Sequence, residues 1–599
     1  MTTPSHTGRW TRWAVALGVV LGLGIITPPD ASADARHRKP HRPAVVATHG
    51  RAQPVAVRKR GRLAPPAIAQ VAIGPLAFGD LTVDETPAPR KPALAPPAAT
   101  AAAIAIDKLL RGPLRHGTTA LYVVDAATGR ELFSLRPDER LNPASNVKMI
   151  STAAALDLLG PDFQYRTRLL GPGPDAAGLI DGDVYLHGSY DPTLGESGLE
   201  DLAAQVAAGG VKTIHGDVLV GSVATRDGLY RSKIHVDVVA TAAGAAPRVD
   251  VTPASDFVEV VNLATTGKRP KVKGRITVGT EVVTRTDGHT RLVITVRGLI
   301  GKGKHTESAL FTKERHFHAA HVLRAALRRH GVELTGDVAI RALPAYVDGL
   351  AAIGRLPIAL GENRSAALGD IVAQVNKRSI NWLSDRIIAT AALTGHDDLP
   401  SVAHGVDAMY AWLDRRTGIG RGDAFVDTGS GLSHRTQLSA RQLVGVLRTA
   451  AGFTAHGDDD ARIVACAQAF THSLSVAGVD GTLRGRFRAD GLRGRVIGKT
   501  GTLRDSIALS GLLTGADDRR IAFSLVTNGH DSTHKRAVRA GHEAVLEILD
   551  HYLAATATAR PAIIVAAPVV ATVAAALPAA DPAAHEDSDE EGSDPDDDD

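Results

Sequence analysis

Strand patterns occupy both ends of the segment 101–558, and this feature restricts the possible folds more than any other. Near the start, the apolar run Ala120–Asp125 is followed by a turn and a second run, Glu131–Leu135, as in a β-hairpin. Near the end, Ser506–Leu513 and Ile521–Asn528 flank another turn, and the middle of the segment has helical spacing. We therefore predict an α/β (α+β) domain with one antiparallel sheet, built from both ends of the segment and interrupted by an insertion.

The interior segment differs from its surroundings because it consists of short strand patterns separated by glycine-containing turns. Arg275–Val283 and Arg291–Val296 flank an Asp287-Gly288 turn, and their alternating apolar residues are typical of a half-buried hairpin. We therefore expect the insertion to be β-rich. The predicted boundaries are 101–165 and 345–558 for the interrupted domain, and 166–344 for the insertion.

The two ends of the chain have patterns of their own. In residues 1–33, Arg9 and Arg12 precede an uncharged apolar run that ends in small residues, as in a secretory signal peptide. We expect export to the periplasm or cell envelope, with an uncleaved anchor as the alternative. Residues 34–100 are rich in proline and arginine, and residues 559–599 in alanine, proline and acidic side chains. Both stretches bury too little apolar surface to offset the entropy of ordering, so we predict a disordered linker and tail.

Charge and cysteine content narrow the class of protein further. The net charge of +4 is a sum over unlike segments, because residues 34–100 carry +7 and residues 559–599 carry −10. The basic linker is either an arm that lies on anionic envelope polymers or a solvated tether. Cys466 is the single cysteine, which excludes an internal disulfide, a cysteine-based zinc site and an iron–sulfur cluster.

A serine and a lysine lie together at the predicted start of a helix. Ser145 and Lys148 follow Pro143 and are three residues apart, so their hydroxyl and amine share one helix face. Lysine can act as the base that activates a serine if burial and nearby cations lower its pKa, and a helix N-terminus favours negative charge at the serine. The S-x-x-K pattern alone is weak evidence for a catalytic site, because Ser532–Lys535 also fits it.

Two rarer motifs follow in chain order. Ser379-Ile380-Asn381 is the only S-x-N of the chain, and Lys499-Thr500-Gly501 is its only K-T-G. We expect Ser379 in a turn between helices and Lys499 on an edge-like strand before the terminal hairpin. Penicillin-interacting serine enzymes use the three motifs in this order.

Other stretches extend the match over most of 101–558: Leu141–Ser145, Asp191–Leu194, Asp427–Ser433, Gly478–Leu483 and Gly498–Leu503. With these motifs, the body resembles the low-molecular-mass class C penicillin-binding proteins, the D-alanyl-D-alanine carboxypeptidases and endopeptidases that carry a large insertion after the nucleophile helix. The resemblance implies a penicillin-binding-protein/β-lactamase-like serine transpeptidase fold. Gly188–Asp191 and Ser222–Val251 depart from the family pattern, so the resemblance says less about the insertion.

The resemblance implies catalytic roles for five residues. Ser145 would be the acylated nucleophile, and Lys148 its base. Ser379 would relay a proton to the leaving amine, and Asn381 would orient the substrate amide. Lys499 completes the set by meeting the substrate's negative charge.

The resemblance also implies how the end of the substrate is bound. Lys499 and Thr500 would meet the terminal carboxylate of D-alanine, in the segment that continues through Gly501 and Thr502. The backbone N–H groups of Ser145 and Thr502 would form the oxyanion hole. No metal or cofactor is expected.

The main hypothesis is therefore a serine-type D-alanyl-D-alanine carboxypeptidase/endopeptidase. It would hydrolyse peptidoglycan stem peptides through an acyl-enzyme, and β-lactams would be covalent inhibitors. We expect association with the envelope surface and no nucleic-acid partner. The alternatives are a β-lactamase of the same fold, for which no acidic residue stands in a recognisable deacylating motif, and a non-catalytic cell-wall-binding homologue.

Three further features are given structural interpretations. His316, His318 and His321 form no H-E-x-x-H pattern, so we predict a solvated helix rather than a metal site. Ser430 lies between two glycines without completing G-x-S-x-G, and is interpreted as part of a tight turn supporting the site. Trp382 either lines the substrate cleft or packs in the core.

Overall fold

The structure is a computed structural model that describes most of the chain from residue 97 to residue 557. The chain divides into the units Met1–Pro89 and Arg90–Asp599, and all described residues belong to the second unit. The predicted signal peptide, nearly all of the linker, the tail and the Asp287-Gly288 turn lie outside the described residues. Within the described part, no helix is long and apolar enough to span a bilayer. The undescribed positions between 97 and 557 are Ser189, 222–232, 271–274, 287–289, 312–314, 394–400, 455–460 and 488–490.

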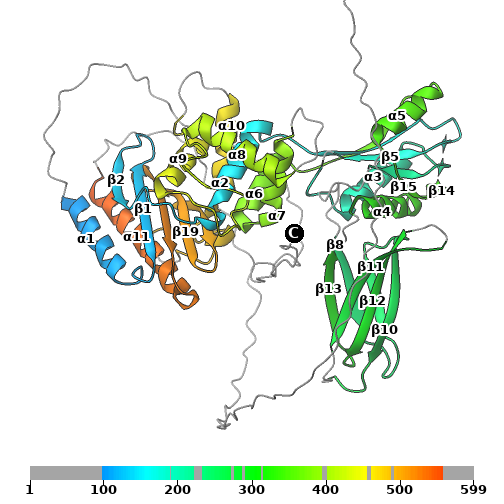
Figure 1. Cartoon of the computed structure of the whole chain (residues 1–599), viewed down its shortest axis with the longest axis horizontal. Coiled ribbons are helices and arrows are strands. Elements are labelled where there is room, and N and C mark those ends of the chain that lie inside the picture. Colours follow the sequence, from blue (N-terminus) through cyan, green and yellow to red (C-terminus); the bar gives the residue numbers. More distant parts are fainter. Residues whose placement is uncertain are drawn as a thin grey trace, which may run out of the picture. The chain divides into compact units, whose positions relative to one another are not determined.

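A six-stranded antiparallel sheet joins the two ends of the body (Figure 1). Its order, β17-β18-β19-β20-β1-β2, places the first strand of the body beside the last, which confirms the prediction of one sheet from both ends. The strands are β1 (Thr118–Asp125), β2 (Glu131–Leu135), β17 (Ser475–Val476), β18 (Val496–Thr502), β19 (Ser506–Thr514) and β20 (Arg520–Asn528).

Alternate residues of the central strands pack into two different cores. In β1, Tyr122 and Val124 contribute to the core shared with most of the helices, whereas Leu121 and Val123 contribute to the core on the other face. Successive side chains of a strand point to opposite faces, so a strand covered on both sides reads as a continuous apolar run. Figure 1 shows α1 (Pro97–Arg111) and α11 (Lys535–Ala555) covering that other face.

The helical layer surrounds one central helix, α2 (Lys148–Leu159), which follows the 3-10 turn Ala144–Val147. Every residue of α2 from Lys148 to Leu156 is buried. Such a helix is enclosed on all sides and shows no amphipathic pattern. Around it lie α6 (Leu368–Arg378), α7 (Asn381–Ala391), α8 (Val402–Thr417), α9 (Ala440–Ala450) and α10 (Ala461–Ser473).

The insertion between α2 and α6 is rich in strands. One part has the five-stranded sheet β15-β7-β5-β3-β16 and the small sheet β14-β6-β4, with α3 and α4 sharing their core. The last strand, β16, lies beyond residue 344 but pairs with β3. The elements are β3 (Arg166–Gly171), β4 (Leu179–Ile180), β5 (Val184–Gly188), α3 (Glu196–Ala208), β6 (Thr213–Ile214), β7 (Val218–Val220), α4 (Arg315–Arg329), β14 (Glu333–Leu334), β15 (Val338–Ile340), α5 (Leu343–Ala352) and β16 (Ile358–Arg364).

A second part of the insertion consists of two three-stranded sheets, β13-β8-β9 and β10-β12-β11, that share one apolar core. Strands β11 and β12 pair antiparallel, which confirms the predicted hairpin. The strands are β8 (Lys233–Val239), β9 (Arg248–Thr252), β10 (Val258–Thr266), β11 (Ile276–Thr284), β12 (Thr290–Ile300) and β13 (His305–Phe311).

Candidate active site

The three sequence motifs meet where the start of α2 lies between strand β18 and the turn from α6 to α7. Ser145 lies in the 3-10 turn, and Lys148 is the first residue of α2, as the sequence predicted. Asn142 anchors the chain before them to β20, because its N–H donates to Oδ1 of Asn528 at 2.6 Å and its carbonyl accepts from Nδ2 of Asn528 at 2.9 Å. The position of Ser145 is therefore tied to both the sheet and the helix.

The amine of Lys148 is the centre of the site. Its Nζ lies 3.0 Å from Ser145 Oγ, 2.6 Å from Asn381 Oδ1 and 2.7 Å from the carbonyl oxygen of Ser430. The side chain is fully buried, and this desolvation lowers the pKa of Lys148 to about 7, although the charge of Asp385 acts in the opposite direction. A substantial fraction of the amine is then neutral near pH 7 and able to accept the proton of Ser145.

Ser379 connects the second motif with the third. It ends α6 in the left-handed conformation, with φ of 58°, in the predicted turn between two helices. Nζ of Lys499 donates to Ser379 Oγ at 2.8 Å and to the carbonyl oxygen of Thr500 at 2.9 Å. Burial lowers the pKa of Lys499, and the positive charge of Lys148 lowers it further. A strained backbone at such a position is typical of functional sites.

Strand β18 is only partly covered along its outer edge. The two residues of β17 pair with Ile497 and Gly498, so within the described part of the chain the ladder stops before Lys499. The exposed side of the strand then presents hydroxyl groups: Thr500 Oγ1 donates to Thr482 Oγ1 at 2.8 Å, and Arg539 Nη2 donates to Thr502 Oγ1 at 3.3 Å. An unpaired edge of this kind can accept an extended peptide.

Gly501 allows β18 to approach the segment that carries the nucleophile. A Cβ at this position would lie 2.4 Å from the carbonyl oxygen of Pro143 and 3.1 Å from Cβ of Ala144. We expect Gly501→Ala to push the strand away from Ser145 and to slow acylation by roughly 100-fold, the effect of a displacement of about 1 Å in an active site. The second-order rate of labelling by fluorescent penicillin measures this.

Gly485→Ala is the matched control, because a Cβ there meets nothing within 4 Å. The prediction for Gly501→Ala is wrong if the two variants are labelled at equal rates.

Asp385 was missed by the sequence reasoning. It is a largely buried carboxylate on α7 whose charge acts on Lys148. Its position four residues after Asn381 places both on one face of the helix, and this spacing is the signal that could have identified it. Ser430 lies beside Gly431, whose φ of 73° marks the predicted tight turn. Trp382 is partly buried and packs against the helical core.

The predicted solvated helix at His316–His321 is wrong. On α4, His318 and His321 are both buried, because the helix faces the two three-stranded sheets as well as the layer with α3. The ring of His321 stacks on Phe257 with centroids 5.2 Å apart. Burial, together with the charge of His321, lowers the pKa of His318 to about 3. The side chains of α4 that would be solvated on an isolated helix are covered here by the strands that pack on it.

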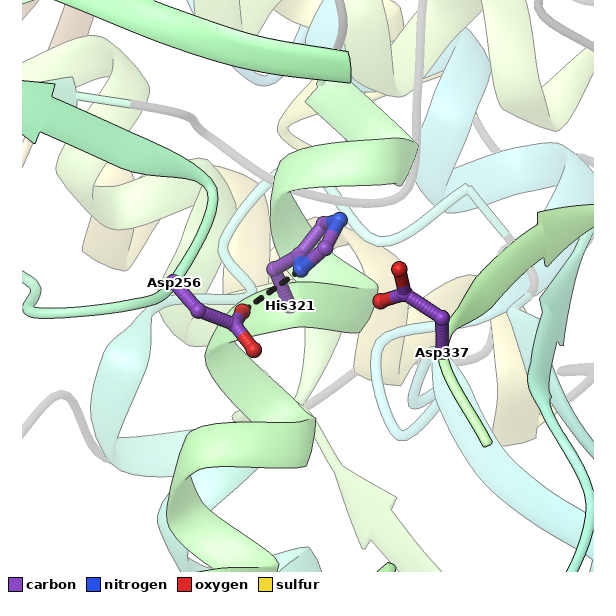
Figure 2. Close-up of side chains that lie close together, drawn as sticks. All are labelled: Asp256, His321 and Asp337. Atoms are coloured by element: carbon purple, nitrogen blue, oxygen red, sulfur yellow. Dashed lines mark hydrogen bonds and ion pairs between the residues drawn. The ribbon is translucent and has the colours of Figure 1, made fainter. Parts of the chain in front are cut away.

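His321 belongs to a charged cluster with Asp256 and Asp337, whose potential ligand atoms lie within 4.8 Å of one another (Figure 2). The guanidinium of Arg324 already bridges the two carboxylates: Nη1 donates to Asp256 Oδ2 and to Asp337 Oδ1, the latter at 3.0 Å. Burial raises the pKa of Asp256, but His321, Arg324 and Arg328 outweigh it and lower that pKa to about 2. Arginine keeps its charge, so the cluster is an ion-pair network in which the cation is a side chain.

Arg324 also donates from Nη2 to the carbonyl oxygen of Gly336 at 2.7 Å, and so joins segments that precede β10 and β15. We expect Arg324→Ala to reduce the free energy of unfolding of the insertion by about 2 kcal/mol. Loss of one partner of a buried ion pair costs roughly 3 to 5 kcal/mol, and the partial exposure of both carboxylates reduces this. Thermal unfolding measures the change.

Arg329→Ala on the same helix is the control, because its pair with Glu200 is solvent-exposed and surface pairs contribute roughly 0 to 1 kcal/mol. Equal losses of stability in both variants would contradict the assignment of a buried network.

Comparisons with known proteins cover most of the described part of the chain, including the segments that carry the three motifs. The family described as "D-Ala-D-Ala carboxypeptidase 3 (S13) family" matches residues 102–549. A D-alanyl-D-alanine carboxypeptidase from Actinomadura sp. is 30% identical over 488 residues, which cover 73% of this chain and 85% of that protein. The D-alanyl-D-alanine carboxypeptidase DacB from Haemophilus influenzae is 25% identical over 412 residues, which cover 65% of this chain and 81% of that protein.

A solved structure shares the fold. Penicillin-binding protein 4 (dacB) from Haemophilus influenzae, crystallised in complex with a novel β-lactam, matches with a TM-score of 0.57 and 22% sequence identity. The match covers 74% of this chain and 99% of that one. It confirms the predicted fold class of an α+β domain of the penicillin-binding-protein type.

Proposed function

Because the chain belongs to the D-Ala-D-Ala carboxypeptidase (S13) family of serine peptidases, we propose that it hydrolyses peptidoglycan stem peptides ending in D-Ala-D-Ala through an acyl-enzyme on Ser145. The observation that carries this proposal is the buried Lys148 amine, which lies 3.0 Å from Ser145 Oγ and has a pKa lowered by burial to about 7. A base with its pKa near the working pH is well suited to proton transfer.

In the acylation step, Lys148 Nζ takes the proton of Ser145 as Oγ bonds to the carbonyl carbon of the penultimate D-alanine. The backbone N–H groups of Ser145 and Thr502 stabilise the oxyanion, and each such donor is worth roughly 3 to 4 kcal/mol in the transition state. Ser379 relays the proton that Lys148 has taken up to the nitrogen of the leaving D-alanine, so that Ser379 is again a hydroxyl and Lys148 is neutral when water attacks. The hydrogen bond from Lys499 to Ser379 Oγ supports this step, because it stabilises the negative charge that develops on the oxygen.

The leaving residue is recognised through its carboxylate. Lys499 supplies a cation, and Thr500 and Thr502 supply hydroxyl groups on the open part of β18. Gly501 leaves the space through which the strand and Ser145 reach the same peptide bond. Asn381 orients the substrate amide while its Oδ1 holds Lys148. Water then attacks the ester and frees the shortened peptide and Ser145.

A β-lactam would enter the same reaction as a substrate analogue. Its ring carbonyl would acylate Ser145, and its carboxylate would meet Lys499 and Thr500 in place of that of D-alanine. The ring nitrogen stays tethered to the acyl group after the bond breaks, so it obstructs the approach of water. Action on the cell wall requires export, for which the pattern of residues 1–33 is the support. Contact with the envelope surface through the basic linker belongs to the same proposal.

Release of D-alanine from purified muropeptides, with cleavage of cross-linked dimers measured in parallel, tests the function directly. Labelling by fluorescent penicillin separates the alternatives. A stable adduct supports the peptidase, whereas rapid drug turnover indicates a β-lactamase. A folded protein that neither labels nor releases D-alanine would contradict both enzymes and support a wall-binding role.

A further inference from the structure

A buried carboxylate lies behind the proposed base and takes no part in the steps above. Asp385 is on α7, one turn beyond Asn381, and burial raises its pKa, while Ser430 and Lys148 act in the opposite direction. Among the described residues, no donor reaches its Oδ1 in normal hydrogen-bond geometry. A buried carboxylate with spare acceptor capacity is costly unless a nearby cation compensates it.

The carboxylate faces the loop that carries the third hydrogen-bond partner of Lys148. Ser430 and the backbone N–H groups of Gly429 and Ser430 favour the charged form of Asp385 and act against the rise in its pKa caused by burial. The approach is close, since a Cβ at Gly429 would lie 3.1 Å from Asp385 Oδ1. In the same loop, the carbonyl oxygen of Ser430 accepts from Lys148 Nζ at 2.7 Å. Asp385 thus lies against the same loop whose Ser430 carbonyl accepts from the proposed base.

The loop is fastened to the helices by neutral groups as well. The carbonyl oxygen of Gly429 accepts from Ser151 Oγ at 2.8 Å and from Ser384 Oγ at 2.9 Å. These bonds can keep the loop in place when the charge of Asp385 is removed. The electrostatic effect of Asp385 can therefore be separated from its structural effect.

The charges around Lys148 come from two elements. Lys499 on β18 is fully buried, and its positive charge and that of Lys148 disfavour each other. Asp385 on α7 is the negative group that acts on Lys148. Without it, two buried ammonium groups would face each other with only neutral acceptors between them, and both would lose protons more readily.

We propose that Asp385 is a positioning residue for the acylation reaction, which aims the Ser430 carbonyl at Lys148 and supplies the negative charge that keeps the Lys148 amine basic enough to take the proton of Ser145. This inference rests on the proposed function, because it assigns Asp385 a part in the same step. Asp385 acts through Lys148 and the loop and does not touch the substrate.

Asp385→Asn keeps the size of the side chain and removes its charge. Loss of the negative charge lowers the pKa of Lys148 below its value of about 7. The neutral amine then persists to lower pH, so the acid limb of the acylation rate moves toward lower pH, by roughly one unit for a nearby charge. Asp385→Glu restores the charge and should return the limb toward its original position.

The experiment is the second-order rate of labelling by fluorescent penicillin from pH 5 to pH 9, measured on the whole exported chain. Asp407→Asn is the matched control, because Asp407 is a solvent-exposed aspartate on the neighbouring helix α8, and its profile should be unchanged. Asp385→Ser is a second neutral variant should Asp385→Asn fail to fold. An Asp385→Asn profile that coincides with the parent, or that falls equally at every pH without a shift, would overturn the proposal.

A direct titration of Lys148 separates this inference from the proposed function. The ¹³C signal of its ε-carbon, assigned by its loss in Lys148→Met, reports the pKa in the absence of any substrate. A lower midpoint in Asp385→Asn than in the parent supports the role of Asp385 even if the parent fails to react with penicillin, an outcome that would contradict the proposed function alone. Equal midpoints in the two proteins would overturn the role of Asp385.

Discussion

Ser145→Ala should abolish covalent labelling by β-lactams and reduce D-alanine release by roughly 10⁴-fold or more, as loss of the nucleophile does in other serine hydrolases. The reason is chemical, since the Ser145 Oγ is the atom that bonds to the substrate carbonyl. The variant should remain folded, because this hydroxyl is only partly buried and, among the described residues, its hydrogen bond is with Lys148. Labelling with fluorescent penicillin and release of D-alanine measure the two effects.

The chain provides its own control for this substitution. Ser532 begins the second S-x-x-K pattern, in a short 3-10 turn that precedes α11. Ser532→Ala should leave labelling and hydrolysis unchanged. Retention of a stable penicillin adduct in Ser145→Ala would show that another residue is acylated.

Lys148→Met should slow acylation by about 10²- to 10⁴-fold, the usual contribution of a general base. In the parent, the neutral amine forms as the pH rises through the Lys148 pKa of about 7, so the acylation rate should rise through the same range and then level off. Methionine has no titrating group, so this rise should disappear along with most of the rate. The measurement is the pH profile of acylation in the two proteins.

The pH dependence of the free energy of unfolding provides an independent check on the pKa of Lys148. The pKa of Lys148 is lower in the folded protein than in the unfolded chain, so the unfolded state binds more protons between about pH 7 and pH 10. The contribution of Lys148 to stability therefore falls as the pH drops from about 10 to about 7, and is constant below that. Lys148→Met should lack this dependence, whereas Lys535→Met on α11 should keep it. A parent-like rate in Lys148→Met would exclude Lys148 as the base.

Local patterns were sufficient to predict the framework of the fold. The runs that became β1, β19 and β20 are continuous because helices cover both faces of the sheet, and the turns between them are short. The spacing of Ser145 and Lys148 also has a local meaning, because residues three apart share a helix face. Similarly, Ser379 was expected in a turn and lies in one, at the end of α6.

The features that sequence reasoning missed depend on residues distant along the chain. His318 and His321 were expected in solvent, and they are buried because Phe257 and its strands pack on α4. Asp385 is not part of a recognised motif. Its electrostatic role depends on the loop at Gly429–Ser430 and on Lys148, which is more than 200 residues earlier in the chain. These packing and charge relations have no fixed spacing along the chain, and the one local signal is the four-residue spacing from Asn381 to Asp385 on α7.

The sequence by itself determined which groups are available for chemistry and the order in which they occur, because helix starts, turns and strands depend on neighbouring residues. Only the tertiary structure decided how those groups are charged. The pKa of Lys148 depends on burial beneath distant segments, on the carboxylate of Asp385 and on the carbonyl of Ser430. Desolvation and Coulomb interactions act through space, so the fold had to bring these groups together before the amine could serve as a base.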